Sequence, residues 1–118
     1  MQTQSLVTLE KANGITVFHI KGDVTAQSEP SFNEAYRKAN DQGAGKILFE
    51  FDENAYINSG GIAVLIQVLA ETHKNKQHTG ITGLSDHFKK IFNMVGITKF
   101  ATIYTTLDEA VKAMSEFT

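Results

Sequence analysis

The sequence predicts an α/β fold in one domain, with a mixed sheet of four to five strands and about four helices. The chain opens with two segments of alternating apolar and polar residues joined by a short turn, which is typical of an antiparallel hairpin. Helical and strand-like segments then alternate, which favours parallel strands with helices packed on the sheet. The 118 residues include one proline and no Gly/Ser-rich linker, so we expect residues 1–118 to form a single domain.

The first three elements follow from periodicity. Residues 5–11 and 15–22 are the predicted hairpin strands, and the turn between them contains Asn13 and Gly14. A helix is predicted from Ser28 because apolar residues then recur at i, i+3, i+4 and i+7, at Phe32, Ala35, Tyr36 and Ala39.

The middle of the chain combines a buried strand with an apolar helix. Residues 46–51 have a continuous apolar centre, which is typical of a strand covered on both faces. A polar corner, Asn58–Ser59–Gly60–Gly61, precedes the next helix, and Asn and Ser are both preferred helix N-caps. The predicted sheet-facing residues of this helix are Ile62, Leu65, Ile66 and Leu69.

Val64 and Val68 are predicted to lie away from that face, beside Gln67 and Glu71. Two interpretations stay open. A neighbouring helix or loop covers the valines, or they form an exposed docking strip next to the Ser59 corner.

The second half repeats the strand and helix pattern. Residues 79–84 are a strand diluted by two glycines, and residues 85–96 are an amphipathic helix that ends at Gly96. Residues 100–104 form a last short strand. Thr106 and Glu109 then have the T-x-x-E spacing of a capping box, which predicts the start of the final helix.

Composition and motifs exclude several function classes. The chain has no cysteine, and its four histidines have no metal-ligand spacing, so no metal or cofactor is expected. The 11 Lys+Arg and 13 Asp+Glu residues give a net charge of -2 without a basic cluster, so nucleic acid is not an expected partner. No segment combines a base, a nucleophile and an orienting group, which argues against an enzyme. Without a signal peptide or a span of ~18 apolar residues, we expect a cytoplasmic protein with no direct membrane insertion.

Three segments together resemble a known family. The order "KGDVTAQSEPSFNEA", "ILFEFDENAYINSGGIAVL" and "LSDHFKKIFNMVGI" is similar to the STAS domain of bacterial anti-sigma-factor antagonists. In that family a D-S-S-G-L/I corner opens the second helix, and the residue after the Asp is the phosphorylated Ser or Thr. Here Asn58 stands at the Asp position, and Thr25 stands where the family often has Asp.

The resemblance implies a protein-protein interaction module that is switched by phosphorylation of Ser59. Unphosphorylated, it binds an anti-sigma factor that is also a serine kinase, and so regulates transcription indirectly; a serine/threonine phosphatase resets it. The expected partner-binding residues are Asp23, Val24, Thr25, Asn58, Ser59, Gly60, Gly61, Val64, Gln67 and Val68. We expect the free chain to be a monomer, because its apolar stripes can be satisfied internally.

The family resemblance also leaves a second function open. STAS-like domains serve as accessory or regulatory subunits of membrane transport systems for lipids or anions, where no phosphorylation is needed. Asn58 in place of the usual Asp makes this a real alternative.

Overall fold

The computed structural model describes residues 6–116. Its sheet has five strands in the order β1-β2-β3-β4-β5, namely β1 (Leu6–Ala12), β2 (Ile15–Lys21), β3 (Lys46–Phe51), β4 (His78–Thr82) and β5 (Thr102–Ile103). β1 and β2 pair antiparallel, whereas β2, β3, β4 and β5 pair in parallel. The predicted hairpin and mixed sheet are confirmed; residue 5 of the predicted first strand lies outside the described residues.

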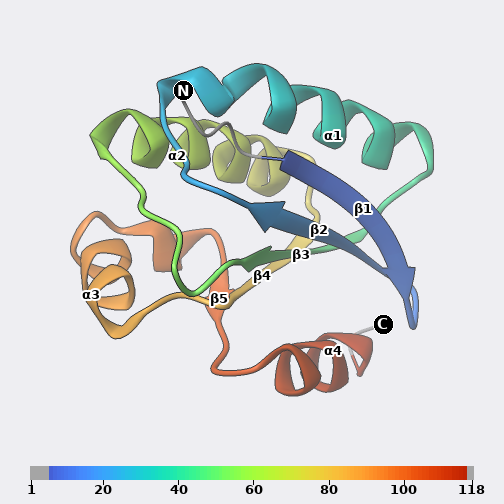
Figure 1. The fold of residues 1–118 in the computed structure, drawn as a ribbon. Coiled ribbons are helices and arrows are strands. Elements are labelled where there is room, and N and C mark those ends of the chain that lie inside the picture. The colour runs from blue at the N-terminus through green and yellow to red at the C-terminus, as the bar shows by residue number, and fades with distance from the viewer. Residues whose placement is uncertain (1–5, 117–118) are drawn as a thin grey trace.

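Four α-helices and two short 3-10 helices complete the fold of the described residues. The helices are α1 (Glu29–Asp41), α2 (Ser59–Lys74), α3 (Asp86–Met94) and α4 (Leu107–Ser115), and the 3-10 helices are η1 (Ala26–Ser28) and η2 (Ile97–Lys99). α1 and α2 cover one face of the sheet and α4 covers part of the other, while α3 lies near the start of α2 (Figure 1).

The larger hydrophobic core lies between the sheet and the α1/α2 layer. Alternate residues of the strands point into it, including Phe18 of β2 and Phe49 of β3, whose rings meet at 4.9 Å between centroids. Phe88 and Phe92 anchor α3 to the same core. A smaller core under α4 contains Ile15, Val17, Leu48, Ala110 and Met114.

The final helix begins at a variant of the predicted capping box. The Thr106 side chain accepts from the Glu109 N–H at 3.1 Å, as the motif predicts. The Glu109 carboxylate, however, accepts from the N–H of Thr105 at 3.0 Å rather than from that of Thr106. Both bonds still satisfy donors at the start of α4.

Candidate functional site

The predicted site lies at the carboxyl ends of the parallel strands. In α/β proteins the loops at this edge converge, because successive parallel strands point in the same direction. The loop after β2 runs up to η1, and the loop after β3 runs past α3 to the start of α2 (Figure 1). Segments more than 30 residues apart in the sequence thus become neighbours.

Main-chain contacts hold these two loops together. Val24 and Ile57 form an isolated parallel bridge. The Val24 N–H donates to the Tyr56 carbonyl at 2.9 Å, and the Asn58 N–H donates to the Val24 carbonyl at 3.2 Å. The Asp23 carboxylate accepts from the Tyr56 N–H at 3.0 Å. Asp23 therefore supports the loop leading to Ser59 in addition to lying beside it.

The glycine pair allows α2 to begin in direct contact with the first loop. A Cβ on Gly61 would lie 2.1 Å from the Val24 carbonyl oxygen, and one on Gly60 would lie 3.0 Å from Ala26. Neither glycine is in a left-handed conformation, so close approach of the two backbones, rather than a turn, requires them.

Asn58, not Ser59, is the N-cap of α2. Its backbone is extended, and its side-chain oxygen accepts from the Gly61 N–H at 2.8 Å. Ser59 is the first helical residue and is exposed. Within residues 6–116 its side chain makes no hydrogen bond, so its hydroxyl is available to another molecule.

Thr25 has a local structural role. Its hydroxyl accepts from the Gln27 N–H at 3.1 Å, and the Ser28 hydroxyl accepts from the Thr25 N–H at 3.0 Å, so the two residues form a capping box for η1. A threonine at this position thus caps the 3-10 helix through an oxygen that an aspartate would also provide.

Of the two interpretations of Val64 and Val68, the structure contradicts the exposed docking strip and supports the covered position. Val64 and Val68 are only 4% and 3% exposed and belong to the main core. Ile62 and Ile66, predicted to face the sheet, are instead partly exposed at the edge of that core. Gly61, which packs against Val24, lies on the same buried side of α2 as the two valines.

Burial divides the predicted partner-binding residues into two groups. Four of them are buried and cannot contact a partner, namely Val24, Gly61, Val64 and Val68. The remaining residues reach the surface at least in part: Asp23, Thr25, Asn58, Ser59, Gly60 and Gln67.

Tyr56 is an exposed aromatic residue at this corner that the sequence reasoning did not single out. Its side chain is 59% exposed, and its ring meets that of Phe88 edge to face, with centroids 6.1 Å apart. His87 contacts the same Phe88 ring at 5.0 Å between centroids. The tyrosine lies two residues before Asn58, in a segment that has no clear periodicity.

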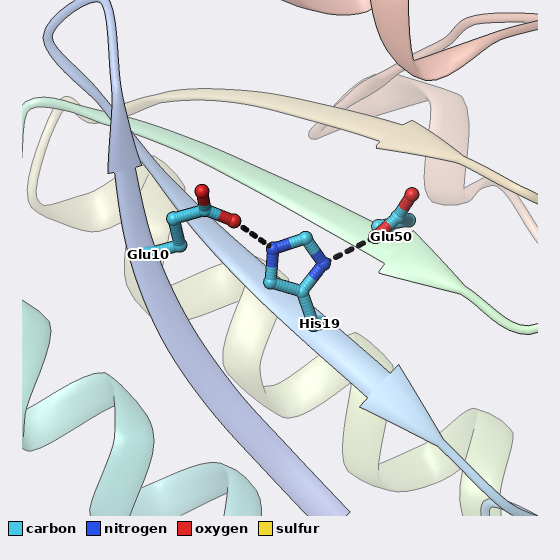
Figure 2. A network of polar contacts seen from close by, with 3 residues as sticks. All are labelled: Glu10, His19 and Glu50. Carbon is cyan, nitrogen blue, oxygen red and sulfur yellow. Dashed lines mark hydrogen bonds and ion pairs between the residues drawn. The ribbon is translucent and has the colours of Figure 1, made fainter.

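A second polar cluster lies on the sheet face that carries α4. His19 on β2 bonds through Nε2 to Glu10 on β1 at 2.6 Å and through Nδ1 to Glu50 on β3 (Figure 2). Burial lowers the pKa of His19, but the hydrogen bonds to both carboxylates and their charges outweigh burial and leave the pKa raised. The cluster links three adjacent strands.

Among residues 6–116, no group of three or more His, Cys, Asp or Glu side chains could hold a metal ion. In the same residues, no helix is long and apolar enough to cross a membrane.

Comparison with known proteins gives the family. The STAS domain model matches residues 7–110. No curated protein matches the sequence. An anti-sigma factor antagonist from Mycobacterium paratuberculosis has a similar fold, with a TM-score of 0.78, 17% identity and 96% of each chain covered.

The fold is also similar to that of SpoIIAA. Unphosphorylated SpoIIAA aligns with a TM-score of 0.70 and 17% identity, over 94% of this chain and 99% of the other. Phosphorylated SpoIIAA from Bacillus gives a TM-score of 0.65 and 18% identity, over 91% and 97% of the two chains. These structures show the same fold, and the family model, which matches most of the chain, shows that the chain belongs to the STAS domain family.

Proposed function

We propose that this chain is an anti-sigma-factor antagonist, a binding module switched by phosphorylation of Ser59. Unphosphorylated, it binds an anti-sigma factor that is also a serine kinase, and it releases this partner once Ser59 is phosphorylated. The observation that carries the proposal is that Asn58 and Ser59 have different roles at the start of α2. Asn58 caps the helix, so the exposed Ser59 hydroxyl has no structural duty.

For the phosphoryl transfer this chain supplies only the Ser59 hydroxyl. The Ser59 oxygen attacks the γ-phosphorus of ATP, the bond from that phosphorus to the ADP oxygen breaks, and the hydroxyl proton passes to a base of the kinase. The kinase supplies ATP, Mg²⁺ and the base. In this scheme the chain acts as the substrate and binding partner of an enzyme, not as an enzyme, and it needs no cofactor for either role.

The helix N-terminus accommodates the product. Ser59 and Gly60 are the first residues of α2, where backbone N–H groups lack partners within the helix and the helix dipole favours negative charge. A phosphoryl group there adds about -1.5 to -2 charge without disturbing a buried group. Phosphorylation thus changes the surface and leaves the fold intact.

The same charge opposes binding. A partner that covers Ser59 must desolvate the phosphoryl group or pair it, and Asp23 already places a carboxylate in the adjoining loop. Release frees the anti-sigma factor to act on its sigma factor, and a serine/threonine phosphatase restores the binding form. In this scheme the free chain is a monomer.

The proposal is tested with candidate serine kinases encoded in the same genome. Each is incubated with the chain and Mg-ATP, and intact mass and peptide mapping follow the product. We expect one phosphoryl group on the wild-type chain and none on Ser59→Ala. Ser115→Ala, which changes an exposed serine at the end of α4, is the matched control and should be modified like the wild type.

Two results contradict the proposal. One is a kinase that binds the chain stably and never modifies Ser59. The other is the purification of the chain in a stable complex with a transport ATPase or permease subunit, which supports the accessory-subunit role instead.

A further inference from the structure

Because Val64 and Val68 are buried, they cannot supply apolar contacts to a partner that covers the Ser59 corner. Such a partner still needs an exposed apolar side chain near Ser59. Interfaces derive most of their binding free energy from a few residues, among which Trp, Tyr and Arg are enriched. Among residues 6–116, the exposed large hydrophobic side chains are Leu6, Tyr56, Met94 and Val95. Of these, only Tyr56 is in the loop that leads to Ser59.

Hydrogen bonds hold the backbone of Tyr56, and its ring contacts Phe88. Its N–H donates to Asp23 at 3.0 Å, and its carbonyl accepts from Val24 at 2.9 Å. Phe88, which is buried at 7% exposure, supports one edge of the ring. The fixed backbone and the contact with Phe88 reduce the conformational entropy that is lost on binding, which favours affinity.

Tyr56 also falls inside the area that a kinase must cover. Ser59 has to reach the γ-phosphate, so the partner's footprint includes it. Tyr56 and Ser59 are three positions apart in the sequence, and their Cα atoms are therefore at most about 11 Å apart. A standard interface of about 800 Å² per partner, centred on Ser59, corresponds to a disc of roughly 16 Å radius. The Cα atom of Tyr56 lies within that distance.

We infer that Tyr56 is the aromatic anchor through which this chain docks on its serine-kinase partner, and that the partner carries an apolar pocket for the ring. The inference rests on the proposed function, because the partner is the serine kinase of the proposed switch. It replaces the valine strip of α2 with the Tyr56 loop as the apolar part of the surface. Asp23 acts here as a positioning residue, since it holds the Tyr56 N–H.

The test measures the affinity of unphosphorylated variants for the kinase that modifies the wild-type chain. Titration calorimetry with a non-hydrolysable ATP analogue prevents turnover. Tyr56→Ala is expected to raise Kd about 30-fold, equivalent to about 2 kcal/mol. Tyr56→Phe keeps the ring and should stay within about threefold of the wild type.

Two controls separate docking from folding. Leu6→Ala removes a side chain of nearly equal exposure, 60%, from the outer strand β1 and should leave Kd unchanged. Denaturant midpoints are recorded for every variant, since Tyr56 covers part of Phe88. If Tyr56→Ala does not fold, Tyr56→Gln carries the test, because it keeps a long side chain over Phe88 without the ring.

The outcomes distinguish this inference from the proposed function. A kinase that binds and phosphorylates the wild type, yet binds folded Tyr56→Ala or Tyr56→Gln equally well, overturns the anchor and leaves the switch standing. If no candidate kinase binds or modifies the wild-type chain, both fail. Weak binding of Tyr56→Ala together with normal binding of Tyr56→Phe and Leu6→Ala supports the anchor.

Discussion

The side-chain oxygen of Asn58 accepts the Gly61 N–H at 2.8 Å, and this bond is the N-cap of α2. Because Asn58 performs this structural role, the neighbouring Ser59 is left exposed with an unused hydroxyl. The two adjacent polar residues thus have different roles, Asn58 in stabilising the helix and Ser59 in the proposed switch.

A first prediction separates these duties by stability. Asn58→Ala removes the cap and should lower the free energy of unfolding by about 1 kcal/mol, within the usual range of roughly 0.5–2 kcal/mol for such caps. Ser59→Ala removes an exposed hydroxyl without a hydrogen bond and should change it by less than about 0.5 kcal/mol. Urea denaturation measures both. A larger loss for Ser59→Ala than for Asn58→Ala contradicts the assignment.

A second prediction concerns the inner face of α2. Val64→Asp and Val68→Asp place a carboxylate in the main core and should lower the free energy of unfolding by at least about 3 kcal/mol, or prevent folding. Gln67→Asp, on the exposed side of the same helix, is the control and should stay within about 0.5 kcal/mol. Small changes for the valine variants would show that they are exposed after all.

A third prediction tests the close approach of α2 to the first loop. A methyl group on Gly61 would meet the Val24 carbonyl at 2.1 Å, so Gly61→Ala should cost about 1–3 kcal/mol and shift the start of the helix. Gly45→Ala adds the same methyl group where nothing lies within 4 Å, and should leave thermal stability nearly unchanged. Equal melting temperatures for the two variants would mean that the loops are not in contact.

A fourth prediction follows from the raised pKa of His19. The folded state holds this proton more tightly than the unfolded chain, whose histidine pKa is near 6.5, so the stabilisation is full below that pH. It is lost as the pH rises through the raised folded pKa. The effect should be about 1 kcal/mol or less, because Glu10 is largely exposed.

Urea denaturation at a series of pH values from 5 to 9 checks this, with Glu50→Gln as the test variant and Glu53→Gln as the control. Glu50→Gln removes one of the two carboxylates that bind His19 and should flatten the pH dependence. Glu53→Gln makes the same chemical change in an exposed loop and should behave like the wild type. If the His19 contribution to the free energy of unfolding increased from pH 6 to pH 8, the raised pKa of His19 would be contradicted.

The elements of this fold could be predicted because their signals are local. Alternation gave the β1–β2 hairpin, and helical spacing gave α1, α3 and α4. The T-x-x-E spacing gave the Thr106 N-cap of α4. The orientation of α2 could not be predicted in the same way. Its apolar residues lie on most sides of the helix, and its close contact with the first loop joins Gly61 to Val24, which is far away in the sequence.

The site was predicted in part for the same reason. The polar corner at Ser59 is a local motif, and it lies where the motif predicts, at the start of α2. The support of Tyr56 by Phe88, and the contacts of His19 with Glu10 and Glu50, join separate elements. They depend on strand register and loop packing, which cannot be predicted from the periodicity of apolar residues in the sequence.

The most direct test of the switch compares one affinity in two chemical states. The chain is prepared unphosphorylated and fully phosphorylated at Ser59, and the Kd of each for the kinase that modifies it is measured by titration calorimetry with ADP and Mg²⁺. We expect phosphorylation to raise Kd at least a hundredfold, equivalent to about 3 kcal/mol, with unchanged secondary structure by circular dichroism. Equal affinity of the two states would contradict the account, because Ser59 would then be a modified residue that switches nothing.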